Sequence, residues 1–463
     1  MNGAIMQRII GLAVATFAFS SLGGGPATAS ESGWSFDEGA QRPTIDVAAL
    51  LTAARGAPPI ICSLAAGSVG NGWGGWADAP YSPLAASAGP LTYRSRDDRN
   101  FSAEDVRRLF AGLSSDDACV RELSVRLIGT QRAENVGGEL ISRLGAGDVP
   151  TRAVAALGLG LVEAQTGVDP LIRSLRDAAV EVRANSAWAL GRIENGRALN
   201  PLVGLFSDDA EKVREAAVAA VGHLESTSAV PALIRVARQD NSPNVRRVAV
   251  WALGKMEARE AVPALVEALG RDTDTRVREM AAWSLGNIED QRGVAALGNA
   301  VRNDSEDRVR ETAVWALGNI GDRSAVDILD RATSDRSAYV RGTAAWALGN
   351  LDDEGAKAPA GLLKLLSDES TDTRLKAAWA LGQLEDRNAI SAIRDAMKSE
   401  RNDRVRKALI RALMKSGESS EATLTELLSS NDPQVREAAV RGLAGARSFD
   451  PWPWPWPRPR PFP

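Results

Sequence analysis

The chain has 463 residues, of which 44% are hydrophobic, so it is too long for one ordinary core and has enough apolar residues to bury a large one. Its 55 lysines and arginines are balanced by 59 aspartates and glutamates, and both signs are interspersed along the sequence. This balance argues against nucleic acid as the main ligand, because phosphate binding needs a clustered positive field.

Residues 1–29 have the pattern of a secretory signal peptide. Arg8 gives a charged start, residues 9–19 are apolar, and the ATA sequence at residues 27–29 is a typical cleavage site. The apolar stretch is much shorter than the roughly 20 residues that a membrane span requires, and no later segment approaches that length. We therefore expect a periplasmic or secreted protein that begins near Ser30 and has no transmembrane span.

Residues 30–100 differ in composition from the rest of the chain. A helical TIDVAALLTAARG stretch is followed by an apolar segment and a Gly/Trp-rich segment. Because terminal units of a repeat array need a cap for solubility, we expect a capping segment here. Cys62 and Cys119 are the only cysteines, and an exported protein can form disulfides. Spacing alone leaves a bridge and two separate thiols equally open.

One phrase recurs between residues 101 and 447, as in VRANSAWALGRI, VREMAAWSLGNI and VRETAVWALGNI. We call its arginine the marker arginine and number later positions by their distance from it. The apolar residues follow a helical period, and no segment alternates like a strand. A second helix precedes each marker helix, with Pro231 and Pro263 in the first turn, where helices tolerate proline. The marker arginines, spaced 30 to 33 residues apart, are Arg121, Arg152, Arg183, Arg214, Arg246, Arg278, Arg310, Arg341, Arg374, Arg406 and Arg436.

These residues resemble the short-unit HEAT repeats of phycobilin lyases and many bacterial proteins, over roughly residues 102–447. The resemblance implies an all-α fold, a right-handed α-α superhelix (HEAT-repeat solenoid) with the marker helices on its inner face. Each unit of such an array contacts only its neighbours, which leaves a long surface free for a partner. The resemblance says little about function, because function on such scaffolds belongs to particular sites.

Two further features refine the repeat. Glycine recurs at position 8, where it costs about 1 kcal/mol relative to alanine inside a helix, so we expect a neighbouring helix to approach closely there. Ser102 is the expected N-cap of the first repeat helix, with Asp105 three residues later. The position 8 glycines are Gly191, Gly222, Gly254, Gly286, Gly318, Gly349 and Gly382.

Tryptophan recurs at position 5, which lies about 155° from the centre of the apolar stripe when each residue advances about 100°. A large apolar ring on that side would favour a surface that binds a partner. Position 9 lies one turn further on the same face and carries asparagine in three successive repeats and glutamine in the fourth. Three Trp-Asn pairs resemble the arrays of armadillo-repeat importins, namely Trp283 with Asn287, Trp315 with Asn319 and Trp346 with Asn350.

In that family the asparagines hydrogen-bond the backbone of an extended peptide, and the tryptophans form slots for its side chains. The resemblance predicts the same use here over three repeats, since Lys255 and Gln383 depart from the asparagine pattern on either side and Ala219 interrupts the tryptophan row. The alternative is that the rings only stack between neighbouring helices. The predicted partner-binding residues are Trp251, Trp283, Asn287, Trp315, Asn319, Trp346, Asn350, Trp379 and Gln383.

Aspartates lie six residues before most marker arginines and suggest a structural Asp/Arg ladder, with each Asp at a helix start and its Arg within reach. Anion binding by the arginines is the alternative interpretation. These aspartates are Asp177, Asp208, Asp240, Asp272, Asp304, Asp335 and Asp368.

His223 is the only histidine, which excludes a His-rich metal centre and a conventional Ser-His-Asp triad. No P-loop or dinucleotide fingerprint is present. We therefore expect no catalytic residues, no metal and no cofactor.

Residues 448–463 form a tail in which alternate prolines prevent helix and strand. Trp452, Trp454 and Trp456 make it a sticky disordered tail, a docking or membrane-surface segment, or a segment that folds back into the tryptophan face. As a whole, the sequence predicts an exported scaffold that binds an extended segment of another protein. The alternative is a lyase-like or chaperone-like helper of the phycobilin-lyase type.

Overall fold

The computed structural model describes residues 45–62, 65, 80–81, 101–351, 357–418, 420–430 and 433–443. All regular structure in these ranges is α-helix or short 3-10 helix, which confirms the predicted all-α fold. The predicted signal peptide and the Trp/Pro tail lie outside the described residues, as does most of the segment 30–100. None of the described helices has the length and apolar character that crossing a bilayer requires.

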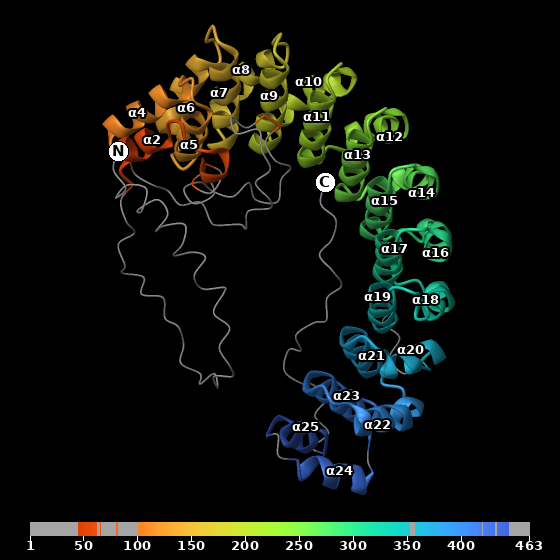
Figure 1. Ribbon diagram of the computed structural model, residues 1–463. Coiled ribbons are helices and arrows are strands. Elements are labelled where there is room, and N and C mark those ends of the chain that lie inside the picture. The colour runs from red at the N-terminus through yellow and green to blue at the C-terminus, as the bar shows by residue number, and fades with distance from the viewer. Residues whose placement is uncertain are drawn as a thin grey trace. The chain divides into compact units, whose positions relative to one another are not determined.

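The helices come in pairs, and each pair consists of a leading helix and the marker helix that follows it (Figure 1). The pairs form two compact units, which meet in the sequence between Leu224 and Glu225. In the first unit the leading helices are α4 (Ala103–Leu113), α6 (Ala133–Arg143), α8 (Val168–Ser174) and α10 (Leu199–Gly204). Its marker helices are α5 (Ala118–Ile128), α7 (Val149–Leu161), α9 (Val180–Ile193) and α11 (Glu211–Leu224).

The second unit continues the same alternation. Its leading helices are α12 (Val230–Gln239), α14 (Val262–Arg271), α16 (Val294–Asn303), α18 (Val326–Ala332), α20 (Ala360–Lys364), α22 (Ile390–Ser399) and α24 (Glu421–Leu428). Its marker helices are α13 (Pro243–Lys255), α15 (Thr275–Ile288), α17 (Asp307–Ile320), α19 (Ala338–Gly349), α21 (Thr371–Leu384), α23 (Asp403–Lys415) and α25 (Pro433–Leu443).

Local sequence signals set where these helices begin. Pro231 and Pro263 occupy the first turns of α12 and α14, as predicted. The Ser102 hydroxyl accepts a hydrogen bond from the Asp105 backbone N–H, so the predicted N-cap is confirmed. Asp274 caps α15 in the same way, by accepting from the backbone N–H of Val277.

Within each compact unit, successive marker helices pack side by side, and each also packs against its own leading helix. In the second unit, for example, α15 contacts α13, α17 and α14 (Figure 1). Five of the position 8 glycines lie where two marker helices meet, namely Gly254, Gly286, Gly318, Gly349 and Gly382. A Cβ built on Gly286 would lie 2.8 Å from the Cα of Ala316 and 2.7 Å from the Trp315 ring. The predicted close approach is therefore confirmed at this glycine.

This contact gives a first prediction. Gly286→Ala should lower the free energy of unfolding by about 1–3 kcal/mol, because the added methyl overlaps the backbone of the next marker helix. Gly270→Ala is the matched control, since a Cβ at Gly270 in α14 would have no neighbour within 4 Å. There the gain in helix propensity should raise stability by about 0.5–1 kcal/mol. Urea denaturation followed by circular dichroism measures both, and equal shifts in one direction would refute the explanation.

A short helix, α2 (Val47–Ala54), packs on α4 and α5 at the start of the first unit. The Asp117 carboxylate accepts a hydrogen bond from the backbone N–H of Gly56 at 2.8 Å. A disulfide joins Cys62 to Cys119 in the first turn of α5, with the two Cα atoms 5.7 Å apart. The segment before the repeats is therefore fastened to the first marker helix by packing, hydrogen bonding and a covalent bond.

Candidate functional site

The tryptophans at position 5 are not exposed, contrary to the prediction. Trp251, Trp315, Trp346 and Trp379 are only 4–7% exposed. Each of the last three rings lies against the position 8 glycine of the preceding unit, as the Trp379 ring does 2.7 Å from a Cβ built on Gly349. The last three rings fill the space between neighbouring marker helices, and none of the four is exposed as a slot for a peptide.

The physical reason is that a helical wheel with a single apolar stripe describes a helix with one buried face. A marker helix has neighbours on both sides as well as its leading helix. The glycine at position 8 leaves room beside the next helix, and the indole of the next unit occupies that room. The alternative that the rings stack between repeats is therefore the correct one for Trp315, Trp346 and Trp379. Trp251 is buried as well.

Trp283 in α15 is different, because its side chain is partly exposed. Asn287 lies one turn later on the same helix, and Asn319 holds the equivalent place in α17. Both amides are also partly exposed, and within the described part of the chain neither makes a side-chain hydrogen bond to another residue. These three residues, which we call the amide face, remain available to a partner.

Three other polar residues at position 9 make contacts between neighbouring repeats. The Asn350 amide donates to the carbonyl oxygen of Gly318 in the preceding unit at 3.1 Å. The Gln383 side-chain oxygen accepts from Lys415 at 2.9 Å. Lys255 forms an ion pair with Glu225 and lies over the Trp251 ring at 6.0 Å from its centroid. Of the four predicted binding amides, only the first two, Asn287 and Asn319, thus remain uncommitted.

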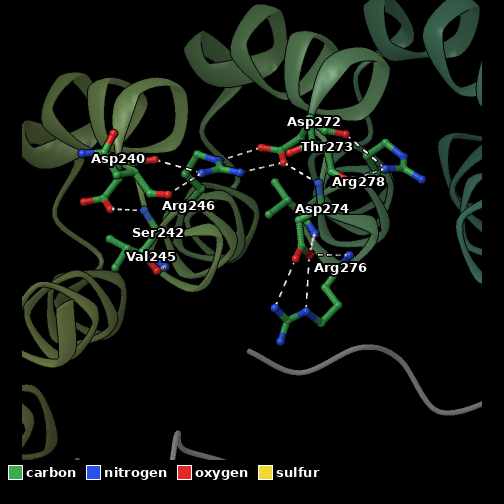
Figure 2. A network of polar contacts seen from close by, with 11 residues as sticks. Asp240, Ser242, Val245, Arg246, Asp272, Thr273, Asp274, Arg276 and Arg278 are labelled. Atoms are coloured by element: carbon green, nitrogen blue, oxygen red, sulfur yellow. Dashed lines mark hydrogen bonds and ion pairs between the residues drawn. The ribbon is translucent and has the colours of Figure 1, made fainter.

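The marker arginines form a ladder, but it is displaced by one unit from the prediction (Figure 2). Arg278 donates from Nε and Nη2 to the carboxylate of Asp304, at 2.8 and 3.2 Å, in the following unit. Its Nη1 donates to the backbone carbonyl of Asp272, the aspartate six residues before it. The Asp272 carboxylate in turn binds Arg246 of the preceding unit.

The same pairing between successive repeats recurs in both compact units. The pairs are Arg152–Asp177, Arg183–Asp208, Arg246–Asp272, Arg278–Asp304, Arg310–Asp335, Arg341–Asp368 and Arg374–Glu400. Two parallel hydrogen bonds between a guanidinium and a carboxylate are a strong arrangement. The hydrogen bond from Arg152 holds the pKa of Asp177 below its usual range. These arginines are occupied, which supports the structural interpretation over anion binding.

No other chemical site emerges from the described residues. His223 lies, partly exposed, in the last turn of α11. Among the described residues there is no group of three or more His, Cys, Asp or Glu side chains arranged to hold a metal ion.

One contact escaped the sequence analysis. Asn185 in α9 is fully buried, and its amide binds the backbone of Tyr81, far away in the sequence. The Tyr81 N–H donates to Oδ1 at 3.1 Å, and Nδ2 donates to the Tyr81 carbonyl at 3.0 Å. The sequence does mark this position, because Asn185 is the only asparagine at position 2 among the eleven repeats.

The pattern of HEAT repeats matches the chain at residues 137–222, 203–286, 230–315, 294–360 and 359–444. These matches span more than half of the sequence. The chain belongs to the HEAT-repeat family. No curated protein has a matching sequence.

Several solved structures resemble this HEAT-repeat chain. Importin beta is 14% identical, with a TM-score of 0.57, and the match covers 87% of this chain and 63% of importin beta. An engineered protein is 23% identical, with a TM-score of 0.43 and coverage of 67% and 98%. The complex of CpcE and CpcF of phycocyanin lyase from Nostoc sp. PCC7120 is 24% identical, with a TM-score of 0.32 and coverage of 53% and 93%. At these identities the importin likeness shows a shared HEAT-solenoid fold and nothing more specific.

Proposed function

We propose that this HEAT-repeat protein is an exported scaffold that binds an extended segment of another protein along the amide face of its second unit. HEAT arrays leave one surface of each unit free and are suited to protein partners. Export is supported by the signal-like start of the sequence and by the Cys62–Cys119 bond, since disulfides persist in oxidising compartments.

The observation that carries the proposal is the pair of uncommitted amides in adjacent units. Asn287 and Asn319 are partly exposed beside the partly exposed ring of Trp283. A side-chain amide offers one acceptor and two donors, which suit the carbonyl and N–H of a peptide backbone.

Spacing fits an extended ligand. Neighbouring helices lie about 8–10 Å apart, whereas an extended or polyproline II chain advances about 3.1–3.4 Å per residue. Asn287 and Asn319 would therefore contact backbone groups about three residues apart. The Trp283 ring would cover an apolar side chain near the first of these contacts.

The first step of the test is to identify the partner. A photo-crosslinking amino acid in place of Asn287 or Asn319 should trap one protein in whole cells, and mass spectrometry should locate the crosslink in a single short segment. The same probe in place of Asn299 is the control, because Asn299 lies on the leading helix α16, where Asn303 hydrogen-bonds it at 2.7 Å. Equal trapping from Asn299 would contradict the proposal.

A synthetic copy of the trapped segment then allows the affinity to be measured. Asn287→Ala with Asn319→Ala should weaken its binding by about 10- to 100-fold, because each amide contributes about 0.5–1.5 kcal/mol. Asn299→Ala with Asn303→Ala should leave the Kd unchanged. Isothermal titration calorimetry gives both values, and an unaltered Kd in the first variant would rule out the amide face as the binding site.

A further inference from the structure

The contact between Asn185 and Tyr81 joins a marker helix of the first unit to a segment that is not part of the repeats. Asn185 uses its acceptor and one donor on the same residue, binding both the N–H and the carbonyl of Tyr81. Both hydrogen bonds are made to the backbone of Tyr81, so they do not depend on the identity of its side chain.

The amide of Asn185 is held in place from the repeat side as well. Its Nδ2 also donates to the Ala153 carbonyl of α7 at 2.9 Å. Because the Ala153 carbonyl needs a donor, this bond fixes the orientation of the Asn185 amide, and hence the positions of Nδ2 and Oδ1 relative to Tyr81. A binding group oriented by its own scaffold in this way is preorganised for its ligand.

The identity of residue 185 is exceptional within the array. Besides Asn185, three repeats carry a polar residue at position 2, namely Thr312, Thr343 and Lys376. The other seven repeats carry an apolar residue there, namely Leu123, Val154, Ala216, Val248, Met280, Ala408 and Ala438. Burying an amide costs free energy unless it is hydrogen-bonded. The asparagine is therefore explained by the backbone that it binds.

The phenol of Tyr81 is influenced by burial and by charged residues of α9 and α11. The pKa of its phenol is raised, first by burial and then by the negative charge of Glu181 in α9. Lys212 of α11 and Arg183 act in the opposite direction. These three charged residues belong to the first turns of two adjacent marker helices, α9 and α11.

We propose that the face of α9 around Asn185 is a second binding site, which recognises the backbone of a short turn and is occupied in the free protein by the chain's own turn at Pro80–Tyr81. The site lies in the first unit, so it is independent of the amide face in the second. A partner with a similar segment would bind there only by displacing Tyr81.

The test first measures the contact within the chain. Asn185→Leu keeps the approximate size of the side chain and removes its hydrogen bonds. Chymotrypsin cleavage after Tyr81, followed by mass spectrometry under native conditions, should become at least about tenfold faster in this variant, because a protease must pull the segment away. If Asn185→Leu does not fold by circular dichroism, Asn185→Asp takes its place, since it keeps the acceptor and loses the donors. An unchanged cleavage rate in a folded variant would overturn the proposal.

The second measurement supplies the ligand separately. The probe is a fluorescent peptide with the sequence ADAPYSPLAA of residues 77–86. Tyr81→Pro removes the backbone N–H that donates to Asn185 Oδ1, and should therefore free the site in the full-length protein. Fluorescence anisotropy should then show binding to this variant, and binding at least about tenfold weaker to the wild type, whose own segment competes at high effective concentration.

The double variant Tyr81→Pro with Asn185→Leu completes the design. It should bind the peptide as weakly as the wild type does, because the amide that reads the backbone is gone. Equal affinity of the single and double variants would overturn the proposal, as would the absence of binding to Tyr81→Pro at millimolar peptide.

Discussion

Trp315→Ala should lower the free energy of unfolding by about 3–5 kcal/mol, the range expected when a large buried aromatic side chain is truncated. The ring lies between α17 and the position 8 glycine of α15, where it is only 7% exposed. Its removal would leave a cavity between two units that the helices cannot close without moving their backbones. Urea denaturation followed by circular dichroism at 222 nm measures the loss.

Trp283→Ala is the matched control, because this ring occupies the same position of the repeat but is partly exposed. Its loss should be clearly smaller than that of Trp315, while affinity for a partner on the amide face should fall. The opposite ranking, with Trp283 the more important for stability, would contradict the assignment of the rings to packing and recognition.

Arg278→Ala should lower the free energy of unfolding by about 3–5 kcal/mol, because the largely buried Asp304 carboxylate then lacks its counter-charge. The side chains of Arg278 and Asp304 are 15% and 8% exposed, so solvent screens the pair only weakly. The substitution also removes the donor to the Asp272 carbonyl, at the turn before α15 (Figure 2). The denaturation midpoint reports the effect.

Arg276→Ala, two residues earlier, is the control for charge and helix position. Arg276 pairs with Asp274 on the same helix start, and its side chain is 57% exposed. Exposed pairs contribute about 0–1 kcal/mol, so this variant should differ little from the wild type. Comparable losses in the two variants would show that the ladder contributes no more than ordinary surface charge.

The regular features of this fold could be predicted from the sequence because they repeat. The spacing of the marker arginines, the early prolines of α12 and α14 and the cap at Ser102 depend on local physical rules that each unit satisfies by itself. The close approach at Gly286 could also be predicted, since a repeated glycine inside a helix needs a compensating reason.

The errors arose where neighbouring units interact. The wheel placed Trp315 on an open face, because a single-helix pattern does not represent the adjacent marker helices. Each marker arginine was predicted to pair with the aspartate of its own repeat, whereas the carboxylate partner of Arg278 belongs to the next repeat. Asn185 was missed because its partner, Tyr81, lies 104 residues earlier in a segment without repeats.

The most direct test of the proposed function measures the exposure of Trp283 with and without the partner segment. In hydroxyl-radical footprinting, oxidation of Trp283 should fall when the segment is bound, whereas oxidation of Leu428 in α24, which is exposed, should not change. Protection of Trp283 is the predicted result. Unchanged oxidation of Trp283 at saturating partner would contradict binding on the amide face.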